Sequence, residues 1–275
     1  MISRLKEIPL LRKLFSGVLQ AVRNSQGDWR YIYLPLMWKT AAFLTRRRVT
    51  RMGDIAFTLP CNNWITHFRW YLFARKEVEV RQFIDTHLKE GDVFFDIGAN
   101  IGVFSLYACL RHKSVKVYSF EPEYSNLHLL KENFLANGLA DRANIYSVAI
   151  SDARGLSRLH IQDVTPGAAC HSESREGLER TNEGLKVVWA EGVATMTVDA
   201  LCEELGVVPN AMKIDTDGNE PKILQGAKKT LADPRLRSIA IEMHGEAICR
   251  PILVENGFKL VWSRPDTINQ MWIRE

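Results

Sequence analysis

Apolar runs and amphipathic stretches alternate along this chain from Val93 onward. Five short runs rich in Val, Ile and Phe fit buried strands, and the stretches between them repeat apolar residues at helical spacing. The strands are predicted at 93–96, 116–120, 145–150, 212–215 and 238–243. Strands that are separated by helices pair in parallel, with helices on both faces of the sheet. The pattern therefore predicts an α/β fold with a doubly wound sheet.

Two further apolar runs, at 258–263 and 268–273, are separated only by Arg264-Pro265-Asp266-Thr267. That break is too short for a crossover helix, so the two runs should form an antiparallel hairpin. Parallel strands that finish in such a hairpin are the class I methyltransferase variant of the Rossmann-like doubly wound sheet.

The turn after the first strand carries a distinctive pattern of glycines. Asp96 ends the strand, and Gly98, Asn100 and Gly102 follow in the order D-x-G-A-N-x-G. A dinucleotide fingerprint needs a third glycine so that a pyrophosphate can sit on the helix N-terminus, and it is missing here. The second strand is followed by Glu121, the position that holds ribose hydroxyls in nucleoside-binding βαβ units. A positively charged adenosine ligand without phosphates fits best, and S-adenosylmethionine is that ligand.

Ligands of such sheets lie beyond the carboxyl ends of the strands. We expect Asp96 to face the ammonium or the sulfonium of the cofactor, Glu121 to accept from both ribose hydroxyls, and residues 149–152 to flank the adenine. The expected cofactor-binding residues are Asp96, Gly98, Asn100, Gly102, Glu121, Ala149, Ser151 and Asp152.

An alcohol that accepts a methyl group loses a proton, so a nearby base helps the reaction. The expected catalytic residues are Asp215, Glu220 and His244. Asp215 equally suits a contact with the cofactor's positive charge. Glu220 also fits a simple charge at the start of the following helix, and His244 fits a structural hydrogen bond at a strand end.

Motifs spread over more than half of the chain support a family resemblance. They lie at 96–102, 120–122, Asn133, Asn137, 149–152, 197–201, 213–220, 224–227 and 242–244. In this order and spacing they make the chain resemble the FkbM-type S-adenosylmethionine-dependent methyltransferases. The resemblance implies a class I fold and methyl transfer, most often to a hydroxyl on a sugar, a glycan or a secondary metabolite. One position departs from the family, because Asp217 replaces its usual glutamate and is one methylene shorter.

The N-terminal segment differs from the rest of the chain in charge. Residues 1–51 contain eleven Lys and Arg against two acids, within a net charge of +4 for the whole chain. Apolar residues recur there at helical spacing. We expect residues 1–75 to form a helical, basic cap and residues 76–275 to form the methyltransferase domain. The cap either packs on that domain or lies on an anionic membrane surface, since its most apolar stretch is too short to span a bilayer.

The five cysteines are scattered without a C-x-x-C pair, which indicates a reduced compartment without a disulfide framework or zinc site. We expect a cytoplasmic protein, at most peripheral to the inner face of a membrane, and no bound metal. The polar stretch 162–184 is long for a loop in a compact domain, and we expect a lid over the site, with 165–174 nearest to it.

Two other classes of function remain open. One is an RNA methyltransferase that uses the basic segment as its electrostatic footprint. We do not expect nucleic acid as a partner, because the remainder of the chain is acidic. The other is a non-catalytic binding or scaffold protein, although the cofactor motif is intact.

Overall fold

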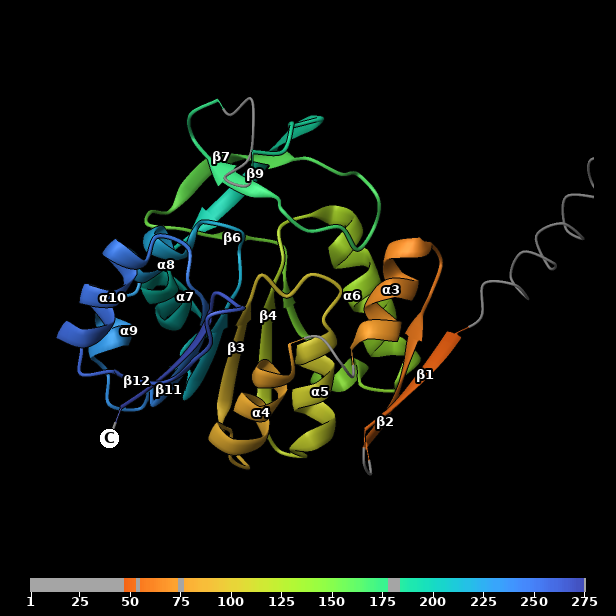
Figure 1. The fold of residues 1–275 in the computed structure, drawn as a ribbon, viewed down its shortest axis with the longest axis horizontal. Helices are drawn as coiled ribbons and strands as arrows, with labels where there is room; N and C mark the ends of the chain where they lie inside the picture. The colour runs from red at the N-terminus through yellow and green to blue at the C-terminus, as the bar shows by residue number, and fades with distance from the viewer. Residues whose placement is uncertain (1–46, 53–54, 74–76, 178–183, 275) are drawn as a thin grey trace, which may run out of the picture. The chain divides into compact units, whose positions relative to one another are not determined.

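The computed structural model describes residues 47–52, 55–73, 77–177 and 184–274. Residues from Arg47 to the C-terminus form one compact unit (Figure 1). The amphipathic stretch within residues 1–46 lies outside the described residues. The described helices include none that is long and apolar enough to cross a membrane.

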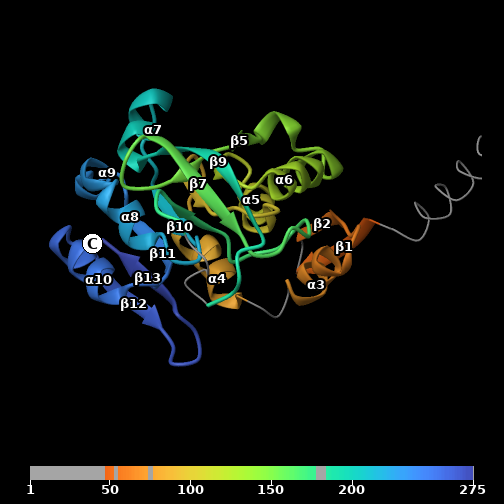
Figure 2. The ribbon, with the colours of Figure 1, turned by 90° about the horizontal axis from the view of Figure 1, so that it is seen from above.

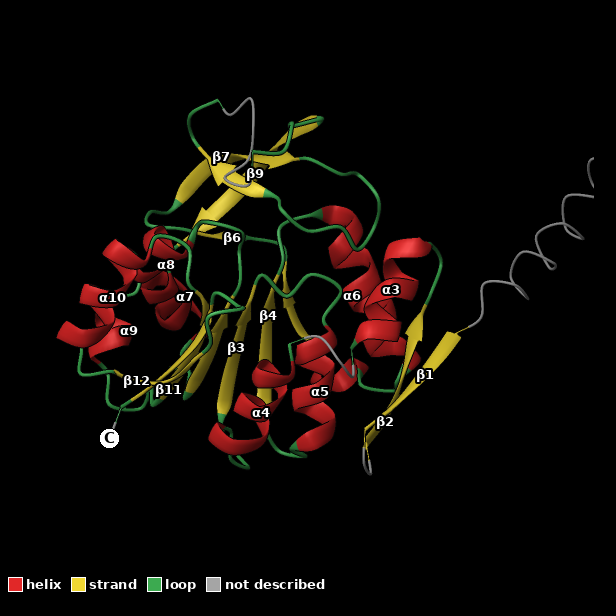
Figure 3. Cartoon of the chain, in the orientation of Figure 1, coloured by secondary structure: helices red, strands yellow, loops and turns green. Residues whose placement is uncertain are grey.

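The centre of this unit is a seven-stranded sheet in the order β12-β13-β11-β10-β3-β4-β5 (Figure 3). Its strands are β3 (Val93–Ile97), β4 (Lys116–Phe120), β5 (Asn144–Tyr146), β10 (Ala211–Ile214), β11 (Ser238–Glu242), β12 (Lys259–Ser263) and β13 (Asn269–Ile273). The neighbouring strands pair in parallel except around β13, which is antiparallel to both β11 and β12. The predicted hairpin and the predicted parallel strands are therefore confirmed.

Helices cover both faces of this sheet because the strands are apolar on both sides. Phe94 packs in one buried cluster and its neighbour Phe95 in the other. The first cluster includes α4 (Val78–His87), α5 (Val103–Arg111) and α6 (Tyr124–Ala136), which is followed by a 3-10 turn at Ala140–Arg142. The second cluster includes α7 (Val198–Leu205), α8 (Glu220–Gln225), α9 (Lys228–Ala232) and α10 (Glu246–Glu255).

The expectation of a helical cap is wrong for part of the described chain before Val78. There β1 (Arg47–Met52) and β2 (Ile55–Pro60) form an antiparallel hairpin that precedes α3 (Trp64–Leu72). Alternate residues of β2 are buried in the first core cluster, and Asn137 bonds both the N–H and the carbonyl of Thr58. A strand suits this segment because its alternating β-branched and aromatic residues bury one face.

A second sheet, which the sequence pattern did not reveal, lies over the carboxyl ends of the central strands (Figures 1 and 2). It consists of β6 (Ala149–Ile150), β7 (Gly155–Ile161), β8 (Ser172–Ser174) and β9 (Trp189–Met196), in the order β6-β9-β7-β8. We call it the accessory sheet. The predicted strand 145–150 is thereby corrected. Its first part pairs with β4, whereas Ala149 and Ile150 pair with β9.

Candidate active site

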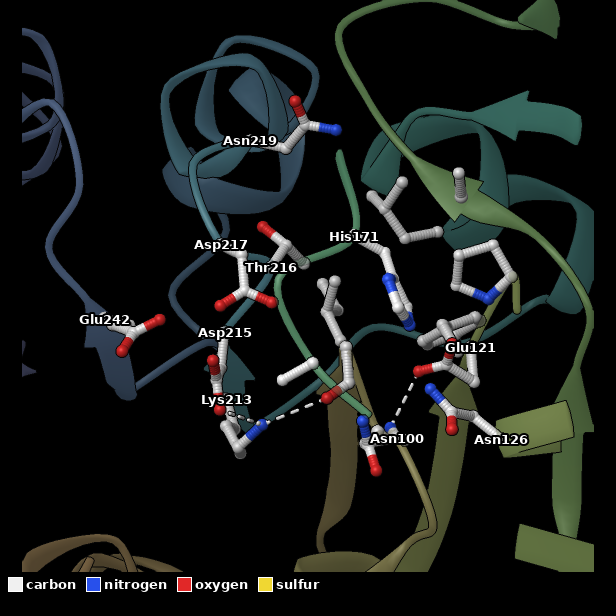
Figure 4. A pocket seen from close by; sticks show the side chains of 18 of the residues that line it. Asn100, Glu121, Asn126, His171, Lys213, Asp215, Thr216, Asp217, Asn219 and Glu242 are labelled. Carbon is white, nitrogen blue, oxygen red and sulfur yellow. Dashed lines mark hydrogen bonds and ion pairs between the residues drawn. The ribbon is translucent and has the colours of Figure 1, made fainter. Parts of the chain in front are cut away.

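A pocket lies between the carboxyl ends of β3, β4, β10 and β11 and the accessory sheet (Figure 4). In open α/β sheets this is where ligands bind, at the point where the strand order reverses. The central strands supply its floor. Leu159 of β7 and Glu173 of β8 supply part of its roof.

The glycine turn after β3 presses against the end of β10. Gly98 has φ +73°, and a Cβ atom at this position would lie 1.8 Å from the carbonyl oxygen of Asp215. The backbone N–H groups of Gly98 and Ala99 both donate to the carbonyl of Phe120. Glycine is therefore required here by steric contact as well as by conformation. Gly102 lies outside the pocket, where it starts α5 and packs on Leu130.

Glu121 lies at the end of β4 and its carboxylate lines the pocket. It is 5% exposed, and its two oxygens accept the backbone N–H groups of Asn100 and Glu123 at 2.8 and 2.9 Å. Burial raises its pKa to about 7, against the opposing effect of these hydrogen bonds. Each oxygen keeps a lone pair, so the carboxylate can also accept from a ligand's hydroxyl groups.

Asp96 does not line the pocket. It is fully buried, accepts a hydrogen bond from Ser105 at 2.6 Å and lies 3.3 Å from the Lys213 Nζ. The same ammonium lies 3.2 Å from an Asp215 oxygen and donates to the Gly98 carbonyl. Asp96 thus holds Lys213, and Lys213 is the group that faces the pocket.

Charge balance around Lys213 sets the protonation states of this part of the site. Burial lowers the Lys213 pKa, but Asp215 and Asp96 raise it further, so the net shift is upward. Burial acts to raise the Asp215 pKa, but the Lys213 charge together with hydrogen bonds from Glu242 and Lys213 outweighs it, so that pKa lies below its ordinary value. At neutral pH the ammonium and the Asp215 carboxylate are both charged.

Three carboxylates meet on one wall of the pocket, from Asp215, Asp217 and Glu242, with oxygens within 4.8 Å of one another (Figure 4). Burial raises the Glu242 pKa to about 7, and the nearby Asp215 charge adds to the effect. Glu242 is not among the catalytic residues expected from the sequence. Its position at the last residue of a buried strand was the available signal.

His244 and Glu220, the other two catalytic candidates, are not among the residues that line this pocket. The His244 Nε2 lies 3.5 Å from a Glu242 oxygen, and this carboxylate raises the His244 pKa to about 9. His244 is therefore protonated at neutral pH. Glu220 is buried, accepts from the N–H and hydroxyl of Thr216, and burial raises its pKa.

Of the residues expected to flank the adenine, Ala149 lines the pocket together with Ile150. Ser151 instead donates to Glu173 at 2.9 Å and so helps to place that carboxylate in the roof. Asp152 is exposed and contacts Ser151 from outside.

The loop between β7 and β8 covers the pocket, in the part predicted to lie nearest the site. It is fixed by four polar side chains, two from α3 and its N-cap, one from the glycine turn and one from α6, and its backbone carbonyls are the acceptors. The donors are Asn63 to Pro166, Arg69 to Gly167, and both Asn100 and Asn126 to Ala168. The loop also places His171 in the pocket, where burial lowers the pKa of its imidazole. Residues 178–183 of the expected lid lie outside the described residues.

The chain matches the family model "Methyltransferase FkbM domain" over residues 96–260. It belongs to the FkbM methyltransferase family. It is 31% identical over 201 residues to the 31-O-demethyl-FK506 methyltransferase FkbM of Streptomyces tacrolimicus, covering 63% of this chain and 75% of that protein. It is 28% identical over 174 residues to the hexuronic acid methyltransferase AglP of Haloferax volcanii, covering 62% of this chain and 63% of that protein.

Among solved structures, an rRNA methylase from Streptococcus thermophilus matches with a TM-score of 0.43 at 13% identity. That match covers 71% of this chain and 94% of that one. Membership of the FkbM family makes this protein a methyltransferase that uses S-adenosylmethionine.

The residues of the pocket suit that cofactor. Glu121 offers acceptors for ribose hydroxyls, Gly98 lines the pocket with backbone alone, and Asp215 with Asp217 and Glu242 gives a negative wall for a cation.

Proposed function

We propose that this protein methylates a hydroxyl oxygen of a sugar, a glycan or another polyhydroxylated small molecule. Two relatives support this choice by their names, since one acts on 31-O-demethyl-FK506 and the other on a hexuronic acid. The three carboxylates on the pocket wall argue against RNA as the methyl acceptor, because they repel a polyanion.

The observation that carries the proposal is the pairing of Asp215 with Glu242. Asp215 stays ionised beside Lys213, whereas Glu242 has a pKa of about 7. A base with this pKa is half deprotonated near neutral pH and accepts a proton efficiently there. A hydroxyl acceptor needs such a base, because it must lose its proton as the new bond to carbon forms.

In this mechanism S-adenosylmethionine supplies a methyl group on a sulfonium. Glu121 holds the ribose, while Glu242 takes the proton from the acceptor's hydroxyl. Lys213 keeps Asp215 ionised and in place. The loop that contains His171 closes the site against water, and positioning of this kind supplies much of the rate of an in-line displacement.

The test is to incubate the protein with S-adenosylmethionine and a panel of hydroxylated glycans that includes hexuronic acids. Mass spectrometry then identifies any product that has gained one methyl group and locates it. We expect an O-methyl product. Glu242→Gln should lower turnover by about 10²–10⁴-fold, whereas the exposed control Glu246→Gln should not. Transfer to nitrogen, or full activity in Glu242→Gln, contradicts the proposal.

We also propose a peripheral contact with the anionic inner face of a membrane, from the cytoplasmic side. Two observations support it, the basic composition of residues 1–51 and an aromatic face on α3. Trp64, Phe68 and Tyr71 are 69%, 40% and 54% exposed and recur at helical spacing. Each Lys or Arg near an anionic surface contributes about 1 kcal/mol.

Vesicle co-sedimentation at low salt tests this contact. The full chain should bind vesicles that contain phosphatidylserine, and removal of residues 1–30 should reduce this binding while the cofactor still binds. The proposed contact is contradicted if the full chain sediments equally with neutral vesicles, or if it does not sediment with anionic vesicles.

A further inference from the structure

The accessory sheet has two faces, and only one of them belongs to the active-site pocket. Side chains alternate along β7, so Leu159 lines the pocket, whereas Arg158 and His160 lie on the opposite, outer face. The same alternation holds in β8, where Glu173 reaches the pocket and its two neighbours lie on the other side. The outer face takes no part in the methyl-transfer site described above.

A hollow on this outer face is lined by two arginines and a histidine. Arg158 and His160 come from β7, Arg175 follows β8, and Trp189 and Ala190 stand at the start of β9. Arg158 is exposed and forms no ion pair with any residue that the structure describes. Arg175 makes one long hydrogen bond, of 3.4 Å, to the Ala153 carbonyl. Acidic side chains are absent from the described lining of the hollow.

Two buried polar side chains on this face have no hydrogen-bond partner among the residues that the structure describes. His160 is 3% exposed and neither of its ring nitrogens is bonded. Ser172, its direct partner across the β7–β8 pair, is 4% exposed and its hydroxyl is also unbonded. Buried polar groups in folded proteins are almost always paired. Of these two side chains, His160 lines the hollow together with Arg158 and Arg175, so its unpaired imidazole indicates a place where a ligand supplies the hydrogen-bond partner.

The donors in the hollow fit an oxyanion. Guanidinium groups bind phosphate and carboxylate through two parallel hydrogen bonds, and the imidazole adds an N–H donor. Three separate donor side chains, Arg158, Arg175 and His160, line the hollow. A phosphate group has enough oxygens to accept from all three, whereas a carboxylate has two. We propose that the outer face of the accessory sheet binds a phosphate group.

Occupation of this hollow would act on the active site through β8. Glu173 lies in the pocket roof between Ser172 and Ser174, and it is held there by Ser151 and Ser157. A phosphate that fixes the outer side of β7 and β8 also fixes the strand that bears Glu173 and follows His171. We therefore expect bound phosphate to lower the KM for S-adenosylmethionine and to leave kcat nearly unchanged.

The test is titration calorimetry of the full chain with inorganic phosphate. We expect saturable binding, which Arg158→Ala and Arg175→Ala should each weaken about tenfold or more. Arg264→Ala is the matched control, because this exposed arginine contacts only Asp266 in the β12–β13 turn among the contacts described. NMR of protein with labelled histidine should show that phosphate shifts the His160 resonance, identified by its loss in His160→Gln.

A second arm distinguishes the source of the phosphate group. Phosphatidylcholine vesicles are compared with and without phosphatidic acid, in the wild type and in Arg158→Ala. Arginine-dependent binding to phosphatidic acid identifies a lipid headgroup, and phosphate binding without vesicle binding identifies a free phosphate ester. The proposal is overturned if wild-type protein shows no saturable phosphate binding. It is also overturned if Arg158→Ala and Arg175→Ala bind phosphate as the Arg264→Ala control does.

Discussion

Single atoms decide how the pocket is shaped, and Gly98 shows this most directly. We predict that Gly98→Ala loses cofactor binding and unfolds at a much lower temperature, because the new methyl group would overlap the Asp215 carbonyl. Gly138→Ala is the control for backbone strain alone. Gly138 also has a positive φ, but a Cβ atom there would meet no other atom within 4 Å. That control should lose only about 1–2 kcal/mol. Thermal unfolding and calorimetry measure both variants, and equal losses contradict the steric argument.

Glu121 is predicted to hold the ribose. Removing two charge-assisted hydrogen bonds, each contributing about 1.5–3 kcal/mol, should make Glu121→Ala bind S-adenosylmethionine about 100-fold more weakly or worse. Because the ionised form is the better acceptor and the pKa is about 7, wild-type affinity should rise as the pH increases through 7. Calorimetry measures both variants, with Glu132→Ala on α6 as the control. If Glu121→Ala binds S-adenosylmethionine as tightly as this control, Glu121 does not hold the ribose.

The Glu242 pKa predicts the pH dependence of turnover. The base acts when deprotonated, so kcat should rise through about pH 7 and then level off. Protonated His244 favours the Glu242 carboxylate and lowers its pKa. His244→Gln should therefore move the acid limb of the profile to higher pH while the plateau stays close to that of the wild type. If His244 were itself the base, the plateau would fall by about 10²–10⁴-fold.

At the scale of elements, the loop over the pocket is held mainly by side chains from outside it. Asn126 donates to the Ala168 carbonyl and accepts from the Gly167 N–H. We predict that Asn126→Ala raises the KM for the cofactor several-fold and speeds hydrogen exchange in residues 165–171. Asn256→Ala, which removes a cap on α10, should change neither. If hydrogen exchange in residues 165–171 is the same in Asn126→Ala as in the wild type, the other contacts are enough to hold the loop and the prediction is wrong.

The hydrophobic pattern predicted the parallel strands and the hairpin because each is a continuous apolar run. It failed at residues 145–150, where one run serves two sheets and the break at residues 147–148 carries neither glycine nor proline. The accessory sheet was missed because β8 is short and polar. Glu121 and the glycine turn were found through local motifs. Glu242 was missed because its role depends on Asp215 and Lys213, which come from another strand.

For the whole molecule, the hairpin at residues 47–60 is part of the core. Ile55, Phe57, Leu59 and Phe73 are buried in the first cluster, and each contributes about 1.5–3 kcal/mol. The three on β2 alone approach the total stability of a typical domain, about 5–15 kcal/mol. We predict that deleting residues 1–46 leaves a folded protein that binds cofactor, and that deleting residues 1–60 does not. Cooperative unfolding of the shorter form in calorimetry would contradict this.

The accessory sheet begins and ends at neighbouring points. Ala149 of β6 pairs with Thr195 of β9, so the chain enters and leaves this sheet through adjacent strands. A segment whose two ends meet can be lengthened, replaced or lost in evolution without displacing the elements on either side. The central sheet, with Gly98 and Glu121, is then free to stay constant while the inserted segment diverges. Exchange of this one continuous stretch of sequence during evolution changes both the roof of the pocket and the binding surface on the outer face.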